Sequence, residues 1–385
     1  MAGGTQRQAE DRRLVPAELA AGEPLLRRLV QSGVLPLVAG VVFAAAFMVV
    51  HALVIWRAGY LRTSGDVTGF ADDPSTYTNL VSGTLVIAYY LWMPRGIAAL
   101  FGGLQTNRVI GPPLEDAASV PTYAAFLDRV RESFGRWWWA LGVLLLTVVS
   151  MLALVLPQYL DLHDEGGTAW AIDAPSLVLS FLWTLINVYG VLMVFVYSAL
   201  TIYWLRRLFG TFAIDVRPLH PDGAGGLAPL GTFTLMLSYV ISLVGIVLVV
   251  TPVTRHYASD GGFEFRWTAE LIAGLAAYVV AAPVVFFAPL AVAHNAMRDA
   301  KDALLLQIAR RFEAEYDAVQ RGLEDDLSGL QDGLQRLESL QTLHQTTADF
   351  PVWPLNIGSL ARFGTSFVSP LVLAVLADVV SGLVD

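Results

Sequence analysis

The chain contains no cysteine, and only one of its 385 residues, Lys301, is a lysine. The absence of cysteine excludes disulfide bonds, thiol catalysis and metal or iron–sulfur sites that depend on cysteine. Charged residues make up 15% of the chain, whereas an ordinary soluble domain has about 25%. The net charge of −9 argues against a nucleic-acid partner, which requires a basic surface.

Hydrophobic residues, by contrast, make up 55% of the chain, and the mean hydropathy is +0.58. A helix needs roughly 20 predominantly apolar residues to cross the hydrocarbon core of a bilayer. Seven stretches meet this requirement: 33–56, 80–101, 137–157, 175–204, 230–253, 267–297 and 356–383. The sequence therefore predicts an all-α, polytopic membrane protein with seven transmembrane helices.

The distribution of arginine and lysine predicts the orientation in the membrane. The N-terminal segment and every second connection hold eighteen of these residues, and the other connections hold four. Because basic residues accumulate on the cytoplasmic side, we expect the N-terminus inside, the C-terminus outside, and a location in the plasma membrane. The predicted parts are a cytosolic N-terminal segment (1–32), helices one to six (33–297), a cytosolic helical anchor (298–355), and helix seven with a short outer tail (356–385).

The predicted cytosolic anchor carries a heptad pattern. Leucines follow one another at spacings of four and three residues, at Leu323, Leu327, Leu330, Leu334 and Leu337. This pattern is typical of helices that pack side by side. Glycines interrupt it, so we expect two packed helices with a turn near Gly322. The pattern leaves open whether they fold as a hairpin on their own subunit or form a coiled coil between subunits.

A stiff, polar loop, "RPLHPDGAGGLAPLG", connects the fourth and fifth apolar stretches at positions 217–231. Its Pro-Asp-Gly sequence is typical of a tight turn, and a structural turn is the favoured interpretation. An anion cradle at a helix N-terminus and a metal site remain alternatives, although the glycine spacing matches neither known phosphate-binding motif and two metal ligands are few. The candidate residues of this loop are Arg217, His220, Asp222, Gly225 and Gly226.

Charged residues inside the apolar stretches are costly and are therefore candidates for function. Arg95 and Asp378 are the two candidates, near the inner end of the second stretch and the outer end of the seventh. Arg95 could also extend to the membrane interface. We find no HExxH, GxSxG or paired-carboxylate motif, so we expect neither an enzyme, nor a cofactor, nor a bound metal.

The seventh stretch changes character along its length. Its inner half is rich in serine and threonine, whereas its outer half is aliphatic. At 100° per residue, one stripe contains Ser359, Arg362, Ser366, Ser369, Leu373, Leu376 and Val380. Such a stripe suits a water-filled vestibule that a hydrophobic constriction closes. The alternative is that small residues let this helix pack tightly within its own bundle.

This layout resembles the seven-transmembrane ion-channel superfamily of insect odorant and gustatory receptors. The shared features are the inside N-terminus, the cytosolic helices before the last span, and the outside C-terminus. The resemblance implies a homotetramer that responds to a small-molecule ligand, with Ser366 and Ser369 lining a cation pore and Leu373 and Leu376 as its gate. The C-terminal signature of the insect proteins, a Thr-Tyr pair followed by Gln-Phe, is missing. "HPDGAGGL" and "VWPLN" are similar to segments of uncharacterised prokaryotic membrane proteins.

The sequence therefore favours an oligomeric ion channel that contacts membrane lipids and no nucleic acid. A non-conducting receptor or scaffold, whose cytosolic helices bind a partner, is the main alternative. A secondary transporter is the third, although the chain shows no internal repeat of the kind common in transporters.

Overall fold

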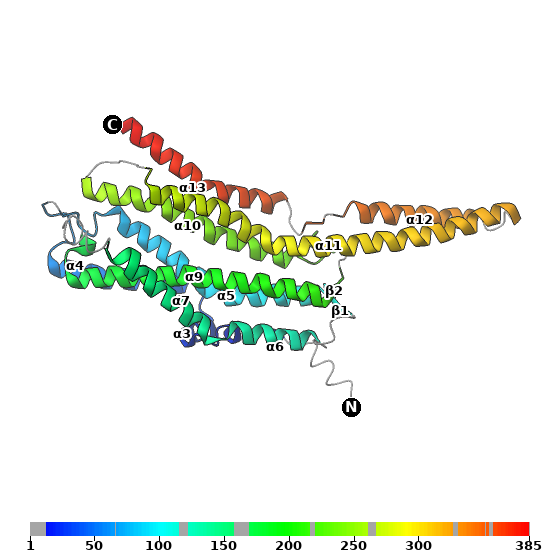
Figure 1. The fold of residues 1–385 in the computed structure, drawn as a ribbon, viewed down its shortest axis with the longest axis horizontal. Coiled ribbons are helices and arrows are strands. Elements are labelled where there is room, and N and C mark those ends of the chain that lie inside the picture. The colour runs from blue at the N-terminus through cyan, green and yellow to red at the C-terminus, as the bar shows by residue number, and fades with distance from the viewer. Residues whose placement is uncertain are drawn as a thin grey trace, which may run out of the picture.

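The protein is mostly helical (Figure 1). Its computed structural model describes residues 13–65, 67–114, 122–157, 169–215, 220–260, 267–325, 330–350, 352–353 and 357–384. The elements are α2 (Pro16–Leu19), α3 (Pro24–Gln31), α4 (Pro36–Ala58), α5 (Pro74–Thr106), β1 (Ile110–Pro113), α6 (Tyr123–Phe134), α7 (Trp137–Ser150), the π-helical turn η1 (Met151–Val155), the short 3₁₀ helix η2 (Ala169–Ala171), α9 (Ala174–Thr211), β2 (Phe212–Ile214), α10 (Ala228–Asp260), α11 (Ala269–Asp325), α12 (Leu330–Ala348) and α13 (Ile357–Val384).

Within the described residues, seven helical segments are long and apolar enough to cross a membrane. They are Pro36–Ala58, Pro74–Thr106, Tyr123–Ala153, Ala174–Thr211, Ala228–Thr251, Leu271–Arg321 and Gly358–Ser381. Each overlaps one of the seven predicted stretches, so the prediction of seven membrane-spanning helices is confirmed. The protein is therefore a multi-pass integral membrane protein.

The second span differs from its predicted bounds. α5 begins at Pro74, six positions before the predicted start, because Asp73 caps it: the Asp73 carboxylate accepts a hydrogen bond from the Ser75 N–H at 2.7 Å. Proline is favoured in the first helical turn, where its missing N–H costs nothing. The helix also continues through Pro94, so the Pro94-Arg95 pair does not interrupt the span.

A short β-ribbon departs from the predicted all-α fold. β1, after α5, pairs antiparallel with β2, after α9, and Ile110 lies opposite Ile214. The sequence of β1, Ile-Gly-Pro-Pro, lacks the alternation that identifies a strand. The ribbon fastens the ends of α5 and α9 to each other, at the end of the bundle from which α11 continues (Figure 1).

The largest core lies where α5, α9, α10 and α11 meet α3 and α6, and it includes Phe101, Phe126, Leu205 and Phe286. α13 lies at one edge of the bundle and packs mainly along α10 (Figure 1). α3, α6 and α7 lie on the opposite side in the same view. One side of the bundle is therefore formed by α13, and the opposite side by α3, α6 and α7.

α11 and α12 form a long antiparallel hairpin that extends well beyond the bundle (Figure 1). Ile308 of α11 and Leu337 of α12 are buried, and a Cβ at Gly333 would lie 2.5 Å from Val319 Cγ2. The two predicted packed helices therefore form a hairpin within the chain. The predicted turn near Gly322 is wrong by a few residues, because α11 remains helical to Asp325.

Candidate functional site

The middle of α13 packs against its own subunit through hydroxyl groups. Pro370 has no N–H, so the carbonyl of Ser366, four residues earlier, loses its helical partner. The Ser242 hydroxyl of α10 donates a hydrogen bond to this carbonyl at 2.6 Å, and lies 3.2 Å from the Ser369 hydroxyl. The Tyr278 hydroxyl of α11 donates to the next carbonyl, that of Phe367, at 3.0 Å. α13 is therefore tied to α10 and α11 at the proline.

The predicted pore stripe falls partly on this packed face and partly on the open surface. Ser366 and Ser369 are half-buried beside Ser242, as described above. Of the remaining members, Ser359 and Leu373 are half-buried, and Arg362, Leu376 and Val380 are exposed. The centre of the stripe therefore packs within the subunit, and a pore-lining role of its exposed members stays a prediction.

The polar loop is a capped turn. The Asp222 carboxylate accepts hydrogen bonds from the N–H groups of Ala224, Gly226 and Ala228 at 3.0–3.2 Å, and it lies 2.8 Å from His220 Nδ1. Partial burial alone would raise the pKa of Asp222, but these hydrogen bonds outweigh it and lower the pKa. The N–H groups that an anion cradle would offer are therefore already occupied.

The same loop packs against the end of α5. Gly223, Gly225 and Gly226 have positive φ, which glycine adopts without steric cost. The Asn107 side chain donates a hydrogen bond to the Gly226 carbonyl at 2.7 Å. Arg217 lies outside the described residues, and those described contain no group of three potential metal ligands. This geometry favours the structural turn.

The two charged candidates each have a defined partner. Arg95 of α5 donates hydrogen bonds to the carbonyl of Val34 at 2.7 Å and to that of Val30 at 3.3 Å. Val30 lies in the last turn of α3, where carbonyls lack helical partners. Asp378 of α13 is exposed and accepts a hydrogen bond from Trp267 Nε1 at 2.9 Å. Arg95 thus secures the N-terminal segment, and Asp378 links α13 to the residues just before α11.

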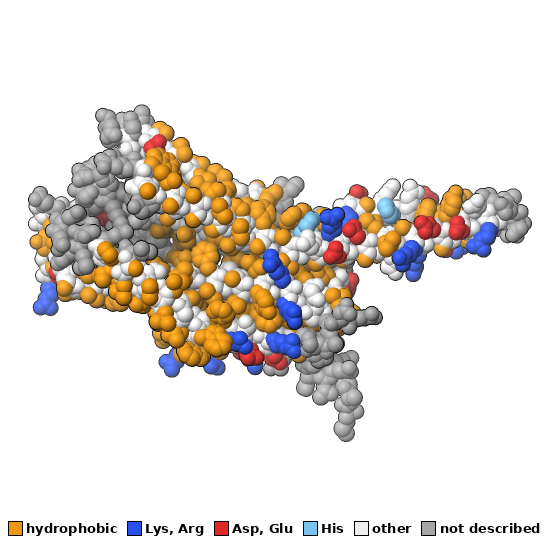
Figure 2. All heavy atoms as spheres, viewed as in Figure 1, with side chains coloured by type: hydrophobic (Ala, Val, Ile, Leu, Met, Phe, Trp, Pro, Cys, Tyr) orange, Lys and Arg blue, Asp and Glu red, His pale blue; other side chains and the backbone are white. Residues whose placement is uncertain are grey.

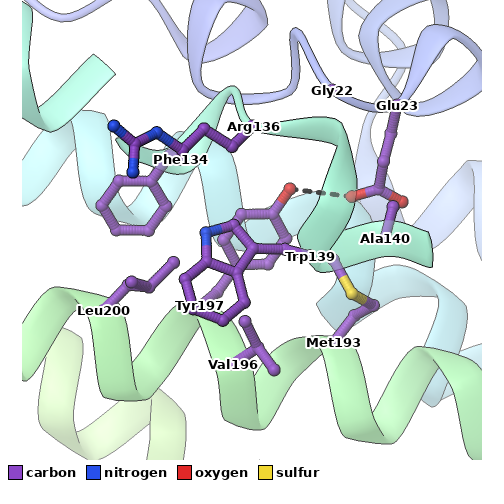
Figure 3. A pocket seen from close by; sticks show the side chains of 10 residues that line it. All are labelled: Gly22, Glu23, Phe134, Arg136, Trp139, Ala140, Met193, Val196, Tyr197 and Leu200. Carbon is purple, nitrogen blue, oxygen red and sulfur yellow. Dashed lines mark hydrogen bonds between the residues drawn. The ribbon is translucent and has the colours of Figure 1, made fainter. Parts of the chain in front are cut away.

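A carboxylate held by three tyrosines is a further site, which sequence reasoning missed. Figure 3 shows this carboxylate, that of Glu23, with one of the three, Tyr197. Glu23, the residue before α3, accepts hydrogen bonds from the hydroxyls of Tyr90, Tyr189 at 2.8 Å and Tyr197 at 2.9 Å. Tyr90 belongs to α5 and the other two to α9. Tyr189 and Tyr197 are eight residues apart, about two helical turns, so they lie on one face of α9.

A small cavity of about 10 Å³ adjoins Glu23, enough for about one water molecule. Its walls include Gly22, Arg136, Trp139 and Tyr197 (Figure 3). Gly22 is required there, because a Cβ would lie 2.9 Å from the Gly135 carbonyl oxygen. The site therefore joins the N-terminal segment, the start of α7 and α9. The sequence signal that could have pointed to this site is the pair Tyr189 and Tyr197, two tyrosines at helical spacing within an apolar span.

Comparison with known proteins found no matching family model, curated protein or solved structure. The resemblance to the insect receptor channels therefore stays an expectation from topology.

Proposed function

We propose that the protein is a homo-oligomeric ion channel of the plasma membrane, with α13 lining a central pore. The supporting observation is that α13 contacts its own bundle along one side, chiefly α10, and leaves its other side open (Figure 1). Its outer half exposes a continuous aliphatic surface, consisting of Val372, Val375, Leu376, Val379 and Val380. Copies of this surface around an axis would form a hydrophobic constriction that gates by dewetting.

The inner half of α13 is more polar on its exposed side. Arg362 and Thr365 are exposed, one turn apart. They suit a hydrated vestibule below the constriction, and Leu360 and Val368 are the large apolar side chains exposed in the same half. The resemblance implies cation conduction and a small-molecule ligand, whereas a ring of arginines favours anions. The flux assay should therefore measure both cations and anions.

The α11–α12 hairpin supplies a second surface for assembly. It extends beyond the bundle (Figure 1) and exposes Leu306, Tyr316, Leu334 and Leu343. Large apolar side chains on an extended hairpin are typical of a surface that binds another protein. A tetramer, which the resemblance implies, would bring four hairpins together around the pore axis.

The channel proposal is tested by ion flux through the purified protein in liposomes. We expect Leu376→Ser to raise the basal flux of cations or anions, because a hydroxyl group favours wetting of the constriction. Val149→Ser on α7, an equally exposed aliphatic position, is the matched control and should leave the flux unchanged. Equal flux from the parent chain and both variants, with intact oligomers, would contradict the proposal.

A non-conducting receptor or scaffold is the second candidate, because the same exposed apolar residues of the hairpin could bind a soluble partner. It differs in one respect that can be measured. A scaffold would keep its partner when Leu376 is replaced and lose it when Leu334 and Leu343 are replaced by polar residues. A channel would change its ion flux when Leu376 is replaced, whereas a scaffold would conduct no ions with either set of substitutions.

A further inference from the structure

α3 is a short amphipathic helix whose apolar half faces in two directions. Leu26 and Val30 are buried against the bundle, whereas Leu25 is 76% exposed and Leu29 46% exposed. At 100° per residue, these four residues cover one half of the helix, and Arg27 and Arg28 lie on the other half. A helix of this kind typically lies in the plane of the membrane interface, with its arginines among the headgroups.

The orientation of α3 is fixed at both ends. Glu23, before its first turn, is held by the hydroxyls of Tyr90, Tyr189 and Tyr197. In its last turn, the Val30 carbonyl accepts a hydrogen bond from Arg95. Leu25 and Leu29 are therefore held on the outer side of the helix.

The start of α7 lies beside the turn that leads into α3. A Cβ at Gly22 would lie 3.0 Å from the Trp137 nitrogen, so the two backbones are in contact. Trp137 is 63% exposed, and the Arg136 guanidinium lies 5.2 Å from the centre of the Trp138 ring. Tryptophan prefers the membrane interface. Figure 2 shows basic side chains, with some acidic ones among them, next to hydrophobic side chains along the edge of the bundle that carries α3 and α6.

We propose that α3 and the start of α7 bind the headgroups of anionic phospholipids. Neither Arg27 nor Arg28 forms an ion pair with a carboxylate of the described residues, so both charges are available. Arg136 contributes less, because it pairs with Glu132 at 3.3 Å. Positive charge and exposed apolar side chains together favour a lipid over a soluble anion, because acyl chains cover Leu25 and Leu29 while the headgroup phosphate meets the arginines.

The experiment titrates the detergent-solubilised full chain with short-chain phosphatidylglycerol, with phosphatidylcholine and glycerol phosphate as separate probes. The test variant is R27Q/R28Q, and the matched control is R310Q/R311Q, an exposed arginine pair on α11. We expect phosphatidylglycerol to bind the parent chain and the control equally. We expect the test variant to bind it roughly thirtyfold more weakly, since each basic residue near an anionic surface contributes about fivefold.

Three results would overturn the proposal. Equal affinity of the test variant and the control would show that Arg27 and Arg28 do not recognise the headgroup. Equal binding of phosphatidylcholine would show that charge plays no part. Binding of glycerol phosphate as tight as that of phosphatidylglycerol would indicate a site for small anions instead. Gel filtration of each variant confirms that the fold is retained, so a loss of binding is not caused by unfolding.

Discussion

Glu23 shows how a single residue connects the N-terminal segment to the membrane-spanning helices. A carboxylate removed from water is costly unless its oxygens are hydrogen-bonded. Three tyrosine hydroxyls from α5 and α9 donate to this one. These hydroxyls are polar groups on otherwise apolar faces of α5 and α9, and the hydrogen bonds to Glu23 explain why they are there. The same hydrogen bonds fix the position of α3.

Tyr197 offers the cleanest test of this cluster, because it is buried and its ring stacks on Phe134 at 5.7 Å. Tyr197→Phe keeps the ring and removes the hydroxyl that donates to Glu23. We expect the free energy of unfolding to fall by about 1.5–3 kcal/mol, the usual contribution of a hydrogen bond to a charged group. Thermal unfolding in detergent measures this change.

Tyr203→Phe is the control, since Tyr203 is an exposed tyrosine on the same helix. It should alter the melting temperature little. A similar, small effect of both substitutions would mean that Glu23 does not depend on the tyrosine hydroxyls for its position.

At the scale of elements, the contact between α10 and α13 determines where the last helix lies. Gly245 allows a close approach: a Cβ there would lie 2.8 Å from Pro370 Cγ and 2.7 Å from Tyr278 Cε2. Ser242, one turn earlier, pairs with the carbonyl that Pro370 leaves free. Gly245 and Ser242 of α10 and Pro370 of α13 thus form one contact between the two helices.

We expect Gly245→Val to separate α13 from α10, because neither the proline nor the packed tyrosine can move aside freely. Overpacking of this kind costs about 1–3 kcal/mol, which thermal unfolding would detect. Gly142→Val on α7 is the matched control, since a Cβ there meets no atom within 4 Å. If both variants melt at the same temperature, the contact between α10 and α13 does not depend on this close approach.

Much of this element-level organisation could be predicted from the sequence. Apolar length alone located the seven spans. A heptad pattern indicated two packed helices but left open whether they pack within one chain, as α11 and α12 do, or between subunits. The β-ribbon was missed because its first strand is only Ile-Gly-Pro-Pro. The Glu23 cluster was missed because its three partners lie 67, 166 and 174 positions away. A glutamate in a charged N-terminal segment gives no local sign that it contacts two membrane helices.

At the scale of the whole molecule, the chain divides into a membrane bundle and a hairpin that extends from it (Figure 1). α13 lies at one edge, and the α3–α7 surface lies on the opposite side. This division suits an assembly in which α13 faces an axis between subunits while α3 and α7 face lipid. A pore lined by α13 therefore requires that copies of α13 come close together.

Cysteine cross-linking in the membrane measures this proximity, because the chain has no native cysteine to interfere. Leu376→Cys places a thiol on the exposed side of α13, and Val149→Cys places one on α7 across the bundle. With a short bifunctional thiol reagent, a pore lined by α13 predicts covalently linked subunits for Leu376→Cys and single subunits for Val149→Cys. Single subunits for both variants, or stronger linkage at Val149, would contradict a pore lined by α13.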